Sequence, residues 1–535
     1  MMIEIETPRA PHAPLRRHNV EGWSVIDTLL IALIVGGGLL YTLLHVNLAN
    51  PPAEDAAMLL RYARQLAAGA GIVWNSGDAP VDGGTDALLI PLLALILKTG
   101  APLAAATHVV TIPAHVLTTV VIYVAIRRIT QGRAPRLLAL VCAAFVLVGP
   151  GLQYIEAHFG TTLFAFLACL CWYRAYLLLE TSASGRDESV FALVALLLGL
   201  ARPEGVLLAA LMLLAVLWLQ PRDRRGMTLR AFALIVGVGG ALYFCWHWAY
   251  FGAPLPNPFY RKGGGVLYPA SLRAAIGNVL IMCFFPLLAW AVSWAACPLS
   301  RRVLALIPPL VGFSVIWVLL SNEMNYAMRF QYALVPIVTL TAGVGLSDVW
   351  TTRVPSWSRR LPPLRAVLLS LGGAAAILAL LFESALSTPR RSGYVELYRV
   401  ALGLASLNAG HETLLTTEAG LLPLYSDWRS VDAWGLNDRW IAHHGAITAR
   451  YIAAVNPRLI VVHPMAAPDA NFTAVQALAW RRMTLTLQGY ARSHGYREVG
   501  SCGVGSRPFC YYVQVGRGDT RDLIATIRRA LGETA

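Results

Sequence analysis

The stretch Asn50-Pro51-Pro52-Ala53-Glu54-Asp55-Ala56-Ala57 closely follows an apolar run over residues 24–46. A run of this length is long enough to span a membrane as a helix. The two prolines end that helix and make the chain that leaves it rigid. Glu54 and Asp55 then begin an amphipathic helix that we expect to reach about residue 66. The sequence therefore predicts two adjacent acids about one turn outside a membrane-spanning segment.

The composition predicts further spans. Hydrophobic residues make up 57% of the 535 residues and charged residues only 13%, whereas a soluble chain carries about 25% charged residues. A shorter apolar segment over 86–97 is expected to be an interfacial or half-inserted helix. The three segments 136–151, 190–201 and 204–219 are short for a span. We expect about eleven transmembrane helices, at residues 24–46, 102–126, 136–151, 161–180, 190–201, 204–219, 230–250, 274–297, 303–320, 330–349 and 364–386.

The arginines indicate how the chain is oriented. The net charge is +14, but the arginines cluster in short gaps between apolar runs, such as 127–136 and 221–230. This distribution argues against a nucleic-acid partner and is typical of cytoplasmic loops. We therefore expect a multi-pass protein of a bacterial inner membrane. Its predicted parts are a cytoplasmic tail (1–22), a transmembrane domain (23–387) with a first outer loop (47–101), and a periplasmic domain (388–535).

The C-terminal part predicts a small α/β domain. Apolar runs at 414–417 and 459–462 and an alternating run at 509–515 indicate strands. Apolar side chains have helical spacing over 472–493 and about 520–532. Cys502 and Cys510 bracket a turn in this domain, and we expect them to form a disulfide in an oxidising compartment. The other six cysteines lie in apolar spans and are interpreted as small buried hydrophobic residues.

Polar motifs occur in the outer segments in a fixed order. They are Glu54-Asp55 followed by Arg61-Tyr62, Gly69, Gly71 and Trp74-Asn75; Asp82-Gly83-Gly84-Thr85-Asp86; Ala201-Arg202-Pro203-Glu204-Gly205; the 251–262 segment that ends Asn257-Pro258-Phe259-Tyr260-Arg261-Lys262; Glu418-Ala419-Gly420; and Asp432-Ala433-Trp434-Gly435-Leu436-Asn437-Asp438. Over nearly the whole chain these motifs resemble those of bacterial C-type (GT-C) polytopic membrane glycosyltransferases, which use polyprenyl-phosphate-linked sugars. The mycobacterial terminal arabinofuranosyltransferases are the most similar type. The chain departs from the group at His158-Phe159-Gly160-Thr161-Thr162, where a Gly-Met-Glu-Thr motif is common.

The resemblance implies transfer of a sugar from a polyprenyl-phosphate donor to a hydroxyl of a cell-envelope glycan or lipid outside the membrane. Such a reaction needs a carboxylate as general base. Glu54 is the expected base, with Asp55 sharing that role or orienting the acceptor. The two acids are not ranked, because adjacent helical residues point about 100° apart and only one can face the site. Whether a divalent cation binds at the first outer loop is left open, and His443-His444 has no third metal ligand spaced nearby.

The leaving phosphate needs cations. Lys262 and Arg261 are the first candidates, followed by Arg202 and Arg329. Arg202 has a structural alternative, a pair with Glu204, and Arg329 has another, extension of its side chain to the membrane interface.

Six further residues are expected to bind the acceptor or the sugar. Asp82 and Asp86 flank a Gly-Gly pair, and turn formation is the commoner role for such aspartates. Alternatively, Asp86 caps the helix at 86–97 while Asp82 faces the sugar. Glu156 and His158 are expected to substitute for the glutamate of the group motif that this chain lacks. The tryptophan can stack on a glycan, although burial is commoner. The six are Asp82, Asp86, Glu156, His158, Trp434 and Asn437.

Two other functions are compatible with a polytopic chain. A transporter or flippase for a lipid-linked or small solute also needs many spans and a few intramembrane charges. The α/β tail and the acidic first loop argue against it. A glycan-binding module anchored by its spans needs far fewer than eleven. Within the enzyme class, an oligosaccharide ligase and a protein O-glycosyltransferase remain open.

Overall fold

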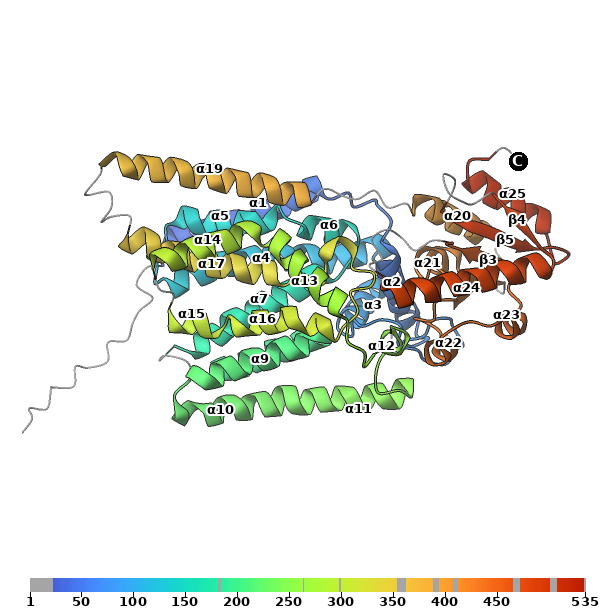
Figure 1. The fold of residues 1–535 in the computed structure, drawn as a ribbon, viewed down its shortest axis with the longest axis horizontal. Coiled ribbons are helices and arrows are strands. Elements are labelled where there is room, and N and C mark those ends of the chain that lie inside the picture. Colours follow the sequence, from blue (N-terminus) through green and yellow to red (C-terminus); the bar gives the residue numbers. More distant parts are fainter. Residues whose placement is uncertain are drawn as a thin grey trace, which may run out of the picture.

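The computed structural model describes residues 23–180, 184–262, 264–297, 300–353, 362–387, 394–407, 412–464, 472–500 and 508–533. Helices occupy one end of the molecule and an α/β domain the other, with α2 (Glu54–Ala67), α3 (Leu89–Lys98) and α12 (Asn257–Arg261) between them (Figure 1). The expected cytoplasmic tail, residues 1–22, lies outside the described residues.

Every predicted span is helical, but several are broken. Among the described residues, seven helices are long and apolar enough to cross a membrane, or eight if a pair bent by 76° counts as one. The count of eleven therefore stays a prediction. The seven are α1 (Val25–His45), α4 (Leu103–Ile129), α5 with α6 (Arg136–Leu147, Gly151–Glu156), α7 (Thr161–Leu178), α10 with η1 and α11 (Arg222–Phe232, Ala233–Val238, Gly239–Phe251), α15 with α16 and η2 (Arg301–Ala305, Pro308–Val315, Ile316–Val318) and α17 (Leu334–Thr352). The bent pair is α13 (Pro269–Met282) and α14 (Phe284–Ala296), and the remaining apolar helices are α8 (Gly185–Ala201), α9 (Glu204–Leu219) and α19 (Pro362–Leu386).

The long helices differ in how deeply they are packed. In the apolar stretch of α7, 78% of the residues are buried inside the molecule, and in that of α17 72% are. In the helix formed by α10, η1 and α11 only 6% are buried. A helix that exposes apolar side chains on nearly all sides is stable in lipid and not in water. The bundle therefore has a packed centre and outer helices whose surface suits lipid.

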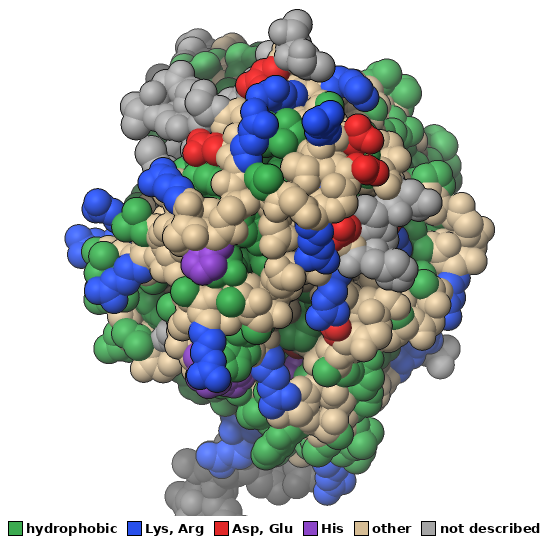
Figure 2. Space-filling view, turned by 90° about the vertical axis from the view of Figure 1, so that its right-hand side faces the viewer, with side chains coloured by type: hydrophobic (Ala, Val, Ile, Leu, Met, Phe, Trp, Pro, Cys, Tyr) green, Lys and Arg blue, Asp and Glu red, His purple; other side chains and the backbone are tan. Residues whose placement is uncertain are grey.

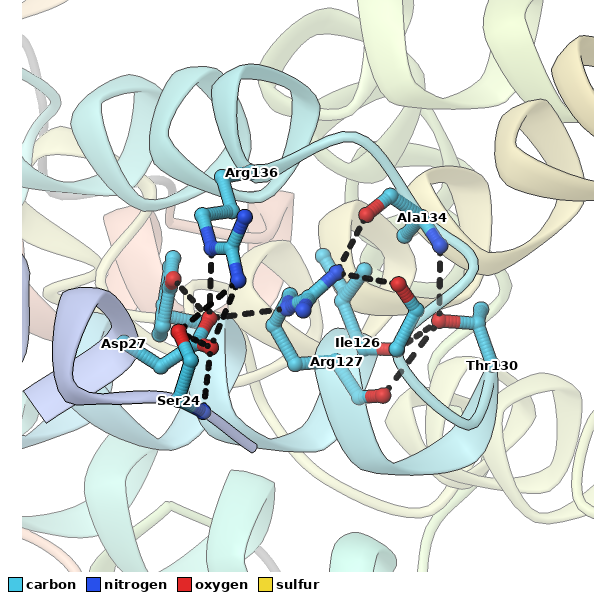
Figure 3. A network of polar contacts seen from close by, with 9 residues as sticks. Ser24, Asp27, Ile126, Arg127, Thr130, Ala134 and Arg136 are labelled. Atoms are coloured by element: carbon cyan, nitrogen blue, oxygen red, sulfur yellow. Dashed lines mark hydrogen bonds and ion pairs between the residues drawn. The ribbon is translucent and has the colours of Figure 1, made fainter. Parts of the chain in front are cut away.

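A buried carboxylate holds α1 to the centre of the bundle at the end far from the α/β domain. Asp27 of α1 is 0% exposed and accepts hydrogen bonds from Tyr123 (2.7 Å) and Arg127 (3.0 Å) of α4 and from Arg136 (3.1 Å) of α5. Arg127 also donates to the Ala134 carbonyl at 2.5 Å, which fixes the turn between α4 and α5 (Figure 3). Three helix ends thus meet at one acid.

The α/β domain contains a five-stranded mixed sheet in the order β2-β1-β3-β5-β4. The strand β1 is parallel to β2 and β3, whereas β5 is antiparallel to β3 and β4. The strands are β1 (Thr413–Thr416), β2 (Arg429–Asp432), β3 (Leu459–Val462), β4 (Tyr496–Val499) and β5 (Cys510–Gln514). The helices are α20 (Val395–Ser406), α21 (Leu421–Ser426), α22 (Arg439–His444), α23 (Ala449–Val455), α24 (Ala474–Ser493) and α25 (Thr520–Ala530).

The three predicted strands and both predicted helices of this domain are confirmed, but β2 and β4 were not predicted. These two are the edge strands of the sheet. The sequence of β4, Tyr-Arg-Glu-Val, has only its last residue buried, so it lacks the apolar run that marks a central strand. Cys510 is disulfide-bonded. Its predicted partner Cys502 lies outside the described residues, so this pairing stays a prediction.

The free end of the α/β domain carries more Lys and Arg side chains than Asp and Glu side chains (Figure 2). Arg481, Arg482 and Arg492 of α24 are exposed, as are Arg521 and Arg529 of α25. The positive-inside bias applies to short loops and not to folded domains. This charge is therefore compatible with the predicted orientation of the chain.

The first outer loop shares a hydrophobic core with the α/β domain. Leu60 and Tyr62 of α2 and Leu93 of α3 are 0% exposed and belong to the same buried cluster as Leu415 and Trp428. The loop and the domain are separated by more than 300 residues of sequence, yet they form one packed unit. The α/β domain is thus attached through α2 and not only through the chain that enters it.

We predict that Asp27→Ala destabilises the bundle, because it leaves Arg127 and Arg136 without their shared carboxylate. Removal of one partner of a buried ion pair costs about 3–5 kcal/mol. The measurement is the thermal unfolding midpoint of the purified protein in detergent. Asp223→Ala is the matched control, since Asp223 is an exposed acid at the start of α10. Equal midpoints for the two variants would contradict the prediction.

Candidate active site

A cavity of about 310 Å³ lies where the first outer loop, the outer ends of several bundle helices and the α/β domain meet. Its charged lining consists of three carboxylates and three cations: Asp55, Asp86, Glu204, Arg202, Lys262 and Arg329. An apolar wall is contributed by Phe259, Ile316, Trp317, Leu319 and Leu320. Five of the predicted site residues are therefore brought together here.

Asp55 and Arg329 form an ion pair in this cavity. The guanidinium of Arg329 donates to Asp55 Oδ2, and 32% of the Asp55 side chain remains exposed. The Arg329 guanidinium also lies over the ring of Phe159, 3.9 Å from its centre. Because the Arg329 side chain is only 7% exposed, it does not extend to the membrane interface, the structural alternative named above.

The Glu54 carboxylate lies outside the cavity. It accepts hydrogen bonds from the backbone N–H groups of Gly420 (2.7 Å) and Leu421 (3.1 Å), at the start of α21. Burial and the nearby carboxylate of Glu418 raise the pKa of Glu54 well above its usual value. The two adjacent acids point to different sides of α2, as helix geometry requires. Glu54 therefore contacts the α/β domain, whereas Asp55 faces the cavity.

Arg61 and Tyr62, about two turns further along α2, make further polar contacts with the domain. Arg61 donates to the carbonyls of Trp74 (2.8 Å) and Trp428 (3.3 Å) and to that of Pro423. The Tyr62 hydroxyl donates to Asn437 Oδ1 at 2.8 Å and accepts from the Gly83 N–H at 3.1 Å. Arg61 and Tyr62 occurred in the family motif, but nothing in the sequence indicated what they contact.

Arg202 pairs with Glu204 and also lines the cavity, so both of the environments expected for it are present. Its Nε lies 2.5 Å from Glu204 Oε1, and its Nη1 lies 3.9 Å from Asp86 Oδ1, while all three residues line the cavity. Burial raises the pKa of Asp86. The predicted side-chain cap from Asp86 is wrong, because the N-cap of α3 is Leu88 and has no side-chain hydrogen bond.

The two neighbouring cations of the 251–262 segment diverge. Lys262 lines the cavity, and its ammonium donates to the Glu323 carbonyl at 3.4 Å. Arg261 does not line it: its Nε donates to the Trp434 carbonyl and its guanidinium lies 3.6 Å from the centre of the Trp434 ring. Of the two, only Lys262 is placed to bind a ligand in the cavity.

The remaining predicted binding residues hold the outer segments together outside the cavity. Asp82 Oδ2 lies 2.8 Å from Nε2 of His247 on α11. Glu156 accepts hydrogen bonds from Asn50 Nδ2 and the Asn47 N–H, and His158 Nε2 lies 3.0 Å from the Asn50 carbonyl. The latter two residues therefore fix the chain just before the Pro51-Pro52 pair.

The aromatic side chain of Trp434 is 2% exposed, so it has the buried environment that was named above as the commoner alternative to stacking on a sugar. Its indole N–H donates to Glu323 Oε1 at 3.1 Å, and Gln476 donates to Glu323 Oε2 at 2.7 Å. Burial raises the pKa of Glu323. Glu323 was not predicted from the sequence, although an acid in an outer loop six residues before Arg329 is the kind of signal that marks a functional position.

No group of three or more His, Cys, Asp or Glu side chains is placed to hold a metal ion anywhere in the described ranges. The carboxylates of the cavity are paired with arginines instead. Metal binding at the first outer loop stays untested.

A family described as "Domain of unknown function (DUF8728)" matches residues 390–512, within the α/β domain. No curated protein sequence matches the chain.

Solved structures with the same fold cover almost the whole chain. ArnT from Cupriavidus metallidurans in the apo state has a TM-score of 0.61 at 14% identity and covers 92% of this chain and 98% of its own. The same protein bound to undecaprenyl phosphate gives 0.59 at 13% identity, covering 91% and 98%. The oligosaccharyltransferase AglB from Archaeoglobus fulgidus, in complex with an inhibitory peptide and a dolichol-phosphate, gives 0.52 at 12% identity, covering 92% and 75%.

The C-type glycosyltransferase fold predicted from the motifs is thus confirmed. Together with the apolar helices, this fold identifies the chain as a multi-pass membrane protein. The arabinofuranosyltransferase type, the inner membrane and the sidedness of the termini stay predictions.

We predict that Gly420→Ala loosens the α/β domain from α2. A Cβ at this position would lie 2.6 Å from the Cα of Glu54, and backbone atoms cannot rotate away. We expect a lower unfolding midpoint and faster proteolytic release of the domain. Gly489→Ala is the control, because nothing lies within 4 Å of its Cβ on α24; it should be neutral or stabilising by up to about 1 kcal/mol. If the two variants were equally stable, this account of the docking would be wrong.

Proposed function

We propose that the chain is a membrane glycosyltransferase that moves a sugar from a polyprenyl-phosphate donor to a hydroxyl of a cell-envelope glycan or lipid on the outer side of the membrane. The observation that carries the proposal is the Asp55–Arg329 pair in a cavity with two further cations and an apolar wall. The fold supports it, because ArnT and AglB have been solved with undecaprenyl phosphate and dolichol-phosphate.

Asp55 is the general base in this proposal. The acceptor hydroxyl attacks the anomeric carbon, the bond from that carbon to the phosphate oxygen breaks, and Asp55 takes the hydroxyl proton. Polyprenyl phosphate leaves with the electron pair of the broken bond. Arg329 holds Asp55 in place through their ion pair. Glu54 is not the base, because its carboxylate binds backbone N–H groups outside the cavity.

Lys262, Arg202 and Arg329 stabilise the negative charge that develops on the leaving phosphate. Lys262 is the least engaged of the three. Its ammonium donates to a backbone carbonyl at 3.4 Å, whereas Arg202 and Arg329 already pair with carboxylates. Arg329 touches the base and also lines the phosphate region, so it links the positions of the two reacting groups.

The apolar wall suits the lipid part of the donor. Phe259, Trp317 and Leu320 are among the side chains that face the cavity between the charged groups and the bundle. A polyprenyl chain gains free energy wherever it contacts apolar surface.

We predict that Asp55→Asn lowers transfer from a radiolabelled polyprenyl-phosphate sugar by about 10²- to 10⁴-fold, the usual effect of a general base. Glu54→Gln should retain the chemistry and mainly lower the stability of the docked domain. Both variants are assayed in membranes after their insertion and expression have been verified. Wild-type transfer that survives unchanged in Asp55→Asn would disprove the proposed mechanism.

We also predict that Lys262→Ala weakens binding of undecaprenyl phosphate by about tenfold or more, because a hydrogen bond to a charged group is worth about 1.5–3 kcal/mol. Lys98→Ala is the control, since Lys98 is exposed at the end of α3 and outside the cavity. The measurement is the dissociation constant of the purified protein in detergent. An unchanged constant for Lys262→Ala would remove Lys262 from the phosphate site.

A further inference from the structure

We propose that a groove between the first outer loop and the α/β domain binds the carbohydrate chain of the acceptor. The inference deepens the proposed function and rests on it, since it names a hydroxyl-rich oligosaccharide as the acceptor class. The groove measures about 530 Å³ and is separate from the cavity that holds Asp55.

Two segments far apart in sequence line the groove. Residues 74–81 of the first outer loop form one side. The other side is built from β2, the start of α22 and the end of α23, including Arg429, Trp440 and Tyr451. A volume of this size falls within the range of about 300–1,000 Å³ that is usual for ligand pockets.

The groove presents the chemistry that recognises sugars. Asp78 and Arg429 form an ion pair at 2.6 Å, and their side chains are 31% and 50% exposed. A hydrogen-bond acceptor and several hydrogen-bond donors are therefore in contact with solvent at the rim of the groove. Trp440 is 38% exposed, and its ring stacks with those of Tyr451 and His444, with ring centres 4.8 Å and 4.5 Å apart. Sugar hydroxyls both donate and accept hydrogen bonds, and the C–H groups of sugar rings pack on aromatic side chains. The exposed part of Trp440 is therefore an aromatic surface that a sugar ring in the groove can contact.

The groove and the catalytic cavity share a wall. Asn437 lines the groove and its neighbour Leu436 lines the cavity, while Val81 lines the groove and Gly83 lines the cavity. The Tyr62 hydroxyl binds both Asn437 and the Gly83 N–H, which fixes the two chain segments of this wall to each other. An oligosaccharide in the groove therefore lies next to the space where Asp55 acts.

The groove does not suit the lipid of the donor, because the charged side chains of Asp78 and Arg429 lie at the rim of the groove and the α/β domain forms one of its sides. A peptide acceptor that adds a strand to the sheet is also disfavoured. The free edge of β2 is already occupied at Ser430, whose N–H donates to Asn75 Oδ1 (2.8 Å) and whose carbonyl accepts from Asn75 Nδ2 (3.0 Å). Strand addition needs these backbone groups unpaired. The observations therefore favour a glycan over a lipid or a peptide.

The test is to block the groove without removing any of its contacts. Ala454 is exposed and lines the groove, so Ala454→Trp fills it. Ala453→Trp is the matched control, because Ala453 is exposed on the same helix but does not line the groove. The first measurement is calorimetric titration of the full chain in detergent, without donor, with oligosaccharides released by mild acid from the envelope of the producing cell.

We expect wild type and Ala453→Trp to bind these oligosaccharides equally and Ala454→Trp to bind them at least about tenfold more weakly. No binding by wild type, or equal binding by Ala454→Trp, overturns the inference. Competition by a strand-forming peptide that Ala454→Trp abolishes would also overturn it, in favour of a peptide acceptor.

A second measurement separates this inference from the proposed function. Initial rates of sugar transfer are recorded while the oligosaccharide and the polyprenyl-phosphate donor are varied in turn. We expect Ala454→Trp to raise KM for the oligosaccharide about tenfold and to leave KM for the donor unchanged. If wild type transfers sugar and Asp55→Asn does not, but Ala454→Trp has an unchanged acceptor KM, the proposed function stands and the groove assignment fails. If the groove binds oligosaccharides but wild type transfers no sugar, the proposed function fails.

Discussion

The docking of α2 on the C-terminal α/β domain is the contact on which the rest of the site depends. Glu54, Arg61 and Tyr62 point into the domain, while Asp55 points into the cavity from the same helix. A helix is rigid over this length, so the domain sets the position of Asp55 without touching it. Arg329, which pairs with Asp55, lies at the end of the 321–329 loop, which leads into α17 of the bundle. The ion pair therefore forms only when the domain and the bundle are correctly placed relative to each other.

Buried acids fix geometry at several points of this molecule. Asp27 joins three helix ends, Glu54 binds two backbone N–H groups of the domain, and Glu323 connects the 321–329 loop to Trp434 and Gln476. A buried polar group that loses its partners costs far more than it gains when paired. Each of these acids therefore admits one arrangement of its neighbours. Of the 29 acidic residues in the chain, these three lie where helices and loops must meet in one way.

The sequence was sufficient for much of the fold. Long apolar runs identified the apolar helices of the bundle, because the length of a span and its hydrophobicity are local properties. The polar helix α10 lies instead in the arginine-rich gap 221–230, which was predicted to be a loop. The central strands β1, β3 and β5 were identified by their apolar residues, whereas the polar edge strands β2 and β4 carried no such signal. Breaks such as the 76° bend between α13 and α14 were not visible, since a bend depends on what packs against the helix.

The site was predicted as a set of residues but not as a geometry. Asp55, Arg202, Lys262 and Arg329 do meet in one cavity. Which of Glu54 and Asp55 faces the cavity could not be predicted, because the direction in which each points depends on a domain that begins more than 300 residues later. The same holds for Arg261 and Trp434, which bind each other instead of a substrate. The partner of a polar side chain is often distant in sequence, so it cannot be predicted from local patterns in a single sequence.

The distance along the chain between the two halves of the docking contact has a consequence for synthesis. The contact of Arg61 with Pro423 spans 362 residues, and that of Glu54 with Gly420 spans 366. Contacts of such high sequence separation form late in folding, because a long loop must close first. During translation the first loop appears early and has to wait for more than 300 further residues before its partner exists. The nascent chain can therefore insert its apolar helices and still have no assembled site until the α/β domain has folded.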